Sequence, residues 1–110
     1  PQPPRVIGIE EPENFLHPRL LPEIAEECRK ASEQSQVLVT THSPFFLNAL
    51  RPEEVRVLAR GEDGYTHVQS AAEIPHISHF MNAGASMGHL WMEGYFDSGE
   101  RDPTVSVPNI

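Results

Sequence analysis

Two short apolar runs, each rich in Val, Ile or Leu and each ending in polar residues and a proline, constrain the fold of this chain most. The first, residues 6–9, leads into Glu10-Glu11-Pro12. The second, residues 37–39, leads into Thr40-Thr41-His42-Ser43-Pro44. Short apolar runs bounded by turn residues are typical of strands that are buried on both faces. We therefore expect two buried strands, separated by residues 10–36.

The segment between the two runs has the apolar spacing of an amphipathic helix, which we expect over residues 18–32. The apolar residues of this segment are Leu20, Ile24 and Cys28 on one line, with Leu21 and Ala25 beside it. A strand, a helix and a strand in this order predict a βαβ unit with two parallel strands and a right-handed crossover. The fold class is therefore α/β.

Parallel pairing brings the polar ends of both strands to one edge. Glu10 and Glu11 would lie beside Thr41 and His42, at the edge where open α/β sheets bind ligands. Adjacent carboxylates repel each other and lose solvation near a sheet, so a bound cation is the simplest partner that stabilises them. Pro12 is expected to hold Glu11 in the extended conformation. The structural alternative is a solvated strand end.

These motifs resemble those of a known group of ATPases. Residues 6–13 look like the Walker B segment of ABC-type ATPases, and more narrowly of the stand-alone bacterial AAA-type ATPases related to RecF, SMC proteins and the overcoming-lysogenization-defect (OLD) family. Residues 14–18 resemble the D-loop that follows, and residues 39–44 resemble the H-loop, whose histidine faces the γ-phosphate. The resemblance covers about the first half of the chain.

The resemblance implies roles for five residues. Glu10 aligns with the acid that holds Mg²⁺, directly or through water, and Glu11 aligns with the catalytic glutamate that orients or deprotonates the attacking water. His42 aligns with the switch histidine that donates to the γ-phosphate. Glu13 and Asn14 would contact the nucleotide site of the second monomer in an ATP-sandwiched dimer. The implied cofactors are ATP and Mg²⁺.

The same loop also has a structural interpretation. Asn14 could be the N-cap of the crossover helix, because asparagine is a preferred capping residue. For His17 we favour a structural role. Thr41 and Ser43 could support His42 or cap the helix that starts at Pro44, and capping is favoured for Ser43.

The length of the chain, 110 residues with eleven prolines, allows at most one small domain. The Gly-rich phosphate loop and the ABC signature segment, which precede Walker B in the family, do not occur in it. We expect residues 1–96 to form the C-terminal part of an ABC/AAA-type ATPase domain: a partial P-loop NTPase sheet with parallel strands, a crossover helix and an antiparallel hairpin. Residues 97–110 are expected to be a flexible tail. The isolated chain should not hydrolyse ATP, because it lacks the residues that grip the phosphates.

The second half of the sequence predicts packing more than chemistry. A β-hairpin is expected around the turn at residues 61–64, and the resemblance places such strands at the antiparallel edge of the sheet. His76, His79 and His89 invite a zinc hypothesis, but a structural site normally needs four ligands and the sequence supplies no others. Residues 84–96 are expected to form a packing helix. Its segment 88–94, Gly-His-Leu-Trp-Met-Glu-Gly, is similar to the C-terminal end of several stand-alone ATPases. We expect this segment to pack in the core, and the alternative is a surface that binds a partner.

Composition limits the function classes. The net charge of −8 argues against a strongly basic nucleic-acid surface in this segment. The single cysteine, Cys28, is expected to be a buried thiol. One cysteine, no signal peptide and no long apolar run favour a soluble cytoplasmic protein without membrane contact.

Three functions fit these observations. The first is a dimeric ATPase coupled to DNA repair, chromosome maintenance or antiphage defence. The second is a nucleotide-controlled sensor or scaffold for an effector nuclease or toxin, with little hydrolysis. The third is a nuclease whose metal sits on Glu10, Glu11 and Glu13. The presence of Glu11 favours hydrolysis, and the expected partners are a second copy, DNA and the effector.

Overall fold

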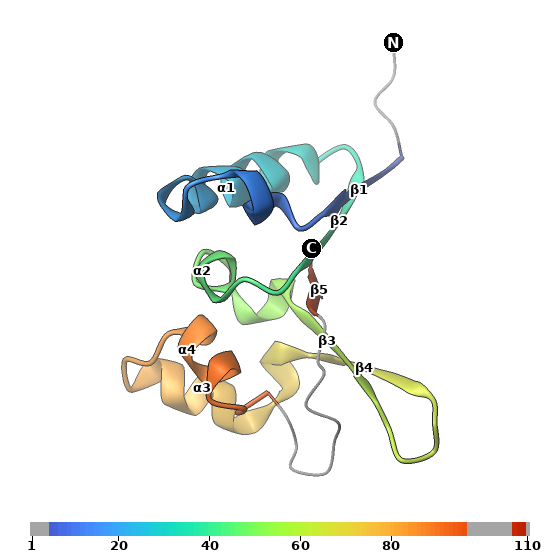
Figure 1. Ribbon diagram of the computed structural model, residues 1–110, viewed down its shortest axis with the longest axis vertical. Helices are drawn as coiled ribbons and strands as arrows, with labels where there is room; N and C mark the ends of the chain where they lie inside the picture. The colour runs from blue at the N-terminus through green and yellow to red at the C-terminus, as the bar shows by residue number, and fades with distance from the viewer. Residues whose placement is uncertain (1–4, 97–106, 110) are drawn as a thin grey trace.

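The computed structural model describes residues 5–96 and 107–109 (Figure 1). The strands are β1 (Val6–Glu10), β2 (Gln36–Thr41), β3 (Arg56–Arg60), β4 (Thr66–Ser70) and β5 (Val107–Asn109). The α-helices are α1 (Leu21–Ala31), α2 (Pro44–Leu47), α3 (Pro75–Asn82) and α4 (Met87–Met92). The short 3₁₀ turns are η1 (Pro12–Phe15), η2 (Pro18–Leu20), η3 (Pro52–Glu54) and η4 (Ala71–Glu73).

The main sheet has the strand order β1-β2-β5. β1 and β2 are parallel, with Val6 opposite Gln36 and Glu10 opposite Thr40, which confirms the predicted parallel pair around a crossover helix. β5 runs antiparallel on the other side of β2. Of the segment predicted to be a tail, residues 97–106 and 110 lie outside the described residues, and Val107–Asn109 forms this strand.

The predicted β-hairpin is confirmed as β3 and β4, which pair from Arg56 opposite Ser70 to Arg60 opposite Thr66. Its predicted place at the antiparallel edge of the main sheet is wrong. β3 and β4 form a two-stranded sheet of their own, because β5 occupies the position beside β2. The hairpin projects away from the helices (Figure 1).

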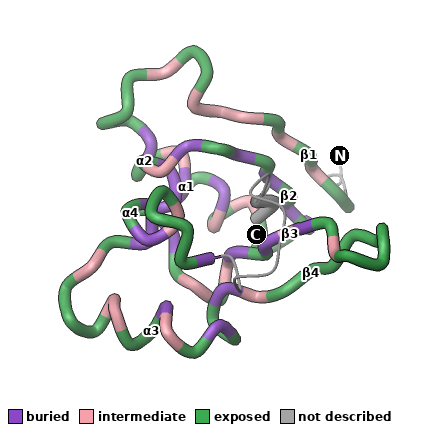
Figure 2. Tube along the Cα trace, turned by 60° about the horizontal axis from the view of Figure 1, so that its bottom comes forward, coloured by how far each residue is buried: buried purple, intermediate pink, exposed green. Residues whose placement is uncertain are grey.

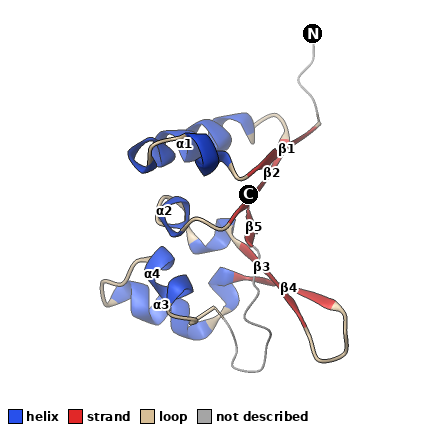
Figure 3. Ribbon diagram, viewed as in Figure 1, coloured by secondary structure: helices blue, strands red, loops and turns tan. Residues whose placement is uncertain are grey.

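The helices gather on one side of the strands in the view of Figure 3. In α1 the buried residues are Leu21, Ala25 and Cys28, whereas Leu20 is 38% exposed. The buried stripe is therefore shifted from the line predicted through Leu20, because residue 20 belongs to the turn η2 that precedes the helix. Cys28 is a buried thiol as predicted, and burial raises its pKa.

Only one face of the β1–β2 pair is covered, so the prediction of strands buried on both faces is wrong for this chain. In β2 the burial alternates: Val37, Val39 and Thr41 are buried, whereas Leu38 is 43% exposed. β1 alternates between exposed and half-buried residues, and Figure 2 shows no buried colour along it. The difference arises because the helices described here lie on a single side of the sheet.

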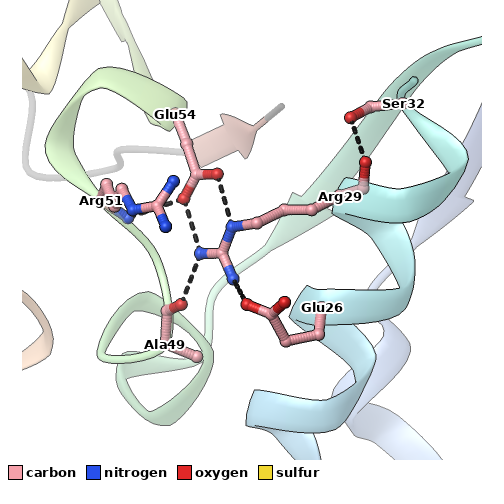
Figure 4. Close-up of polar contacts among 6 residues, drawn as sticks. All are labelled: Glu26, Arg29, Ser32, Ala49, Arg51 and Glu54. Carbon is pink, nitrogen blue, oxygen red and sulfur yellow. Dashed lines mark hydrogen bonds and ion pairs between the residues drawn. The ribbon is translucent and has the colours of Figure 1, made fainter.

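A guanidinium group joins the crossover helix to the segment after α2 (Figure 4). Arg29 donates from Nε and Nη2 to both carboxylate oxygens of Glu54, at 2.7 and 2.8 Å, and from Nη2 to the Ala49 carbonyl at 2.8 Å. The hydrogen bonds from Arg29 hold the pKa of the Glu54 carboxyl below its usual range. This clamp fixes α1 against the part of the chain that follows β2.

Two further ion pairs lie on the surface of α1. Glu26 accepts from Arg29 at 2.5 Å, and Lys30 lies 3.5 Å from Glu27, so each pair joins residues three positions apart. Arg29 already holds Glu54, and the same guanidinium reaches Glu26 with its remaining donors.

Within the described residues, none of the helices combines the length and the apolar character that crossing a bilayer requires.

Candidate functional site at the carboxyl ends of β1 and β2

The ends of the two parallel strands bring a carboxylate and an imidazole into contact. The backbone N–H of Glu11 donates to the Thr40 carbonyl at 2.7 Å, which continues the strand pairing one residue past β1. Oε1 of Glu11 then lies 3.3 Å from Nδ1 of His42. Two residues that the sequence placed at one edge of the sheet are therefore neighbours, although 31 positions separate them.

Glu11 has an unusual backbone. Its φ of 44° and ψ of 63° place it in the left-handed region, and it is the single non-glycine residue with positive φ among those that the structure describes. The prediction that Pro12 keeps Glu11 extended is wrong. The chain turns at once into η1, where Asn14 N donates to the Glu11 carbonyl at 3.1 Å. A strained residue of this kind costs free energy and is found preferentially at functional sites.

Thr41 connects the loop after β1 to the turn after β2. Its hydroxyl donates to Oε1 of Glu13 at 2.9 Å and accepts from the Ser43 N–H at 3.0 Å. Ser43 in turn accepts from the Phe46 N–H at 3.2 Å, which confirms it as the N-cap of α2. Thr41 is 1% exposed. Glu13 is therefore held by Thr41 and not directed toward Glu11 or His42.

Glu10 occupies the last position of β1, opposite Thr40, and is exposed. In residues 5–96 and 107–109 its carboxylate makes no hydrogen bond or ion pair. A free carboxylate at the carboxyl edge of a parallel sheet fits the chemistry of Mg²⁺, which binds through one or two protein carboxylates together with waters and substrate phosphates.

The D-loop-like segment is exposed. Asn14 lies inside η1 and does not cap α1, so the capping prediction is wrong; the chain passes through η1 and η2 before α1 begins. His17 has the structural role that we favoured, because its Nδ1 accepts from the Arg19 N–H at 3.2 Å and caps η2. Phe15, which sequence reasoning did not single out, is 97% exposed.

A second aromatic residue lies beside His42. The ring centroids of His42 and Trp91 are 6.5 Å apart, with an angle of 40° between the ring planes. These two residues line an open pocket of about 360 Å³ together with Pro44 and Met92. The sequence placed Trp91 in a packing helix and gave no signal that α4 reaches the edge of the sheet.

The histidines of the zinc hypothesis do not converge. Nε2 of His76 contacts the Tyr95 carbonyl, and the ring of His79 packs edge-on against Phe80 with centroids 5.6 Å apart. Over the part of the chain that the structure describes, no group of three or more His, Cys, Asp or Glu side chains is arranged to hold a metal ion.

Comparisons with known proteins relate part of this chain to P-loop ATPases. The α/β arrangement, with a parallel strand pair and an antiparallel hairpin, is compatible with part of a P-loop NTPase fold. Residues 1–48 match a family described as "AAA domain, putative AbiEii toxin, Type IV TA system". The matched residues contain β1, α1, β2 and α2, and therefore the whole contact between Glu11 and His42.

One known protein is similar in sequence to half of this chain. A protein named OLD nuclease from Thermus scotoductus (strain ATCC 700910 / SA-01) is 39% identical over 62 residues, which is 50% of this chain and 11% of that protein. The chain thus spans about a tenth of the length of the curated relative that it matches. Both similarities support a relationship to P-loop ATPases.

Proposed function

We propose that this chain is the C-terminal segment of an ATPase that binds and hydrolyses ATP with Mg²⁺ at a dimer interface. The observation that carries the proposal is the contact of 3.3 Å between Glu11 and His42 at the carboxyl ends of two parallel strands, with Glu11 held in the left-handed conformation. That edge is where open α/β sheets bind ligands. The similarity of residues 1–48 to an AAA domain supports the same site.

Glu11 and His42 have different roles in the proposed reaction. Glu11 orients the attacking water and accepts its proton, because it is a carboxylate on a fixed backbone next to a hydrogen-bonding partner. His42 donates to an oxygen of the γ-phosphate and stabilises the charge that develops there. Its Nδ1 faces the acceptor Glu11 and its Nε2 is the atom left for the phosphate, so donation to both requires the imidazolium form of His42, in which both ring nitrogens carry a proton.

Glu10 is the residue that would hold Mg²⁺, and the bound ion would neutralise charge on the phosphates of ATP. Glu13 and Asn14 lie in the exposed loop after β1, and we propose that they meet the nucleotide of a second copy. Thr41 limits the freedom of Glu13, so this loop is presented in a defined conformation. We place the protein in the cytoplasm, coupled to DNA repair, chromosome maintenance or antiphage defence.

The test is Mg²⁺-dependent ATP turnover by the full-length protein that contains this chain, with and without Glu11→Gln. We expect the substitution to lower kcat by about 10²–10⁴-fold, the usual contribution of a general base, while ATP binding persists and dimers accumulate. Glu23→Gln is the matched control, because Glu23 is an exposed glutamate in the first turn of α1 and, within the described residues, makes no hydrogen bond or ion pair with Glu11 or His42. Equal turnover of the Glu11 variant and wild type would refute the assignment.

A second candidate function is nucleotide-controlled gating of an effector nuclease or toxin, with little hydrolysis. The specific observation behind it is the pair of similarities, one to a protein named OLD nuclease and the other to a family described as an AAA domain and putative AbiEii toxin. In this case Glu11→Gln would lock an assembly state and change effector activity, for example DNA cleavage, by more than it changes the slow ATP turnover. The direct-nuclease alternative requires Glu10, Glu11 and Glu13 to converge, whereas Glu11 faces His42 and Glu13 faces Thr41.

A further inference from the structure

The ring of His42 is held by few contacts. Its side chain is 57% exposed, and the polar and aromatic contacts that the structure gives its ring are Glu11 at Nδ1 and the indole of Trp91. The centroid distance of 6.5 Å lies within the range over which aromatic rings interact. An exposed histidine with two ring contacts depends on both of them for its orientation.

The position of Trp91 is set by the close packing of α4 on α2. A Cβ added at Gly88 would lie 2.1 Å from the Pro44 carbonyl oxygen, so a glycine is required there. The Gly88 N–H donates to Oδ1 of Asn48 at 2.7 Å. Met87 and Leu90 are 1% and 2% exposed, so the helix is also anchored in the core. α4 therefore cannot slide or rotate without breaking these contacts.

The spacing within α4 directs the indole to His42. Trp91 follows Gly88 by three residues, and residues three apart lie on the same face of a helix. The face that meets Pro44 through Gly88 therefore carries Trp91 as well, and both Pro44 and Trp91 line the pocket beside His42. Met92 lines the same pocket but is 71% exposed and has no ring to stack on the imidazole.

We propose that Trp91 is a positioning residue, whose indole holds the imidazole of His42 in the orientation in which Nδ1 meets Glu11 and Nε2 is available to the phosphate. The role of His42 in this statement rests on the function proposed above. The orientation itself rests only on the contact between the two rings and on the packing of α4. Without the indole, the imidazole samples the staggered rotamers open to an exposed histidine, which are about three at χ1 and two at χ2.

The kinetic test uses the full-length protein with Trp91→Leu and Trp91→Phe. We expect Trp91→Leu to lower kcat about 3–6-fold, as the rotamer count suggests, with an unchanged KM for ATP, and Trp91→Phe to restore most of kcat. Tyr65→Leu is the matched control, because Tyr65 is an aromatic residue, 73% exposed, in the turn of the hairpin that projects away from the helices (Figure 1). In a His42→Ala background, Trp91→Leu should have no further effect, because it acts through the missing ring.

The same fall in kcat with and without His42 would overturn the proposal, as would a kcat that Trp91→Leu leaves unchanged. A second readout does not depend on ATP turnover: the ring-proton signals of His42 in ¹³C-resolved NMR spectra, assigned by their loss in His42→Ala. The ring current of the indole should displace these signals, and Trp91→Leu should return them toward the values of a free histidine. A protein without turnover whose His42 signals move in this way refutes the proposed ATPase but keeps the positioning role. Signals that do not move refute the positioning role.

Discussion

Oγ1 of Thr41 donates a hydrogen bond to Oε1 of Glu13 at 2.9 Å, across 28 positions of sequence. The same oxygen accepts from the Ser43 N–H at 3.0 Å. Because Thr41 is 1% exposed, both bonds are protected from water on its side. One buried hydroxyl thus joins the loop that follows β1 to the turn that follows β2.

Thr41→Val tests this connection. Valine has the same shape and suits a strand, but it leaves the Ser43 N–H without its acceptor, so we expect a loss of about 1–3 kcal/mol in the free energy of unfolding. Thr40→Val is the control, because Thr40 is its exposed neighbour in β2, and its effect should stay within about 0.5 kcal/mol. Urea denaturation measures both; equal effects of the two substitutions would contradict the role given to Thr41.

The backbone of Glu11 leads to a prediction about two small residues. The left-handed conformation costs an alanine about 1–2 kcal/mol and costs glycine nothing. We therefore expect Glu11→Gly to be more stable to urea than Glu11→Ala by about 1 kcal/mol. At Glu13, where φ is not positive, the order should reverse, with alanine better by about 0.5–1 kcal/mol. Finding the same order at both positions would show that Glu11 is not strained.

The Arg29–Glu54 clamp predicts a pH-dependent stability. The pKa of Glu54 is lowered in the folded state, so its contribution is complete above the unfolded value of about 4.3 and is lost as the pH falls through the folded pKa. We expect Glu54→Gln to lower the free energy of unfolding by about 1–3 kcal/mol at pH 7. The difference from wild type should shrink below about pH 4.

The control for the clamp is Glu53→Gln, since Glu53 is the exposed neighbour in η3 and its carboxylate makes no hydrogen bond or ion pair within the described residues. It should change stability by less than about 0.5 kcal/mol. Urea titrations of wild type and both variants at pH 7 and at about pH 3 separate them. A Glu54→Gln difference that does not vary with pH would mean that the charge of Glu54 is not what Arg29 stabilises.

Gly88 provides a packing test. Gly88→Ala places a methyl group against the Pro44 carbonyl, and overpacking of this kind typically costs about 1–3 kcal/mol. Gly8→Ala is the matched control, because no atom lies within 4 Å of a Cβ added there, and alanine gains about 0.5–1 kcal/mol over glycine inside a strand. The Tm should fall for Gly88→Ala and should not fall for Gly8→Ala. A Gly88→Ala protein as stable as wild type would show that α4 can shift away from α2.

The local parts of this fold were predictable from short patterns. Two apolar runs around an amphipathic segment predicted the parallel pair, and Ser43-Pro44 predicted the start of α2, because strand formation and helix capping depend on neighbouring residues. Parallel pairing then predicted that Glu11 and His42 share an edge. Whether these residues carry out the assigned chemistry stays a prediction.

The remaining parts depend on contacts that the sequence does not show. The rule for residues before proline favoured an extended Glu11, but the turn η1 and the bond from Asn14 to its carbonyl favour the left-handed conformation. The apolar runs predicted strands covered on both faces, but burial alternates along β2. How many faces of a sheet are covered is decided by the tertiary fold, not by the strand's own sequence. The approach of Trp91 to His42 depends on a helix packing across forty positions, which no local pattern encodes.

The contact between Gly88 and Asn48 also has a consequence for synthesis of the protein. Because forty positions separate these residues, the ribosome needs about 2–8 s to add the second after the first, at typical rates of translation. Before Trp91 is made, the nascent polypeptide can already pair β1 with β2 and bring Glu11 to His42. The site around His42 is therefore assembled in two stages: the contact with Glu11 can form first, and the contact with Trp91 can form only after Trp91 has been synthesised.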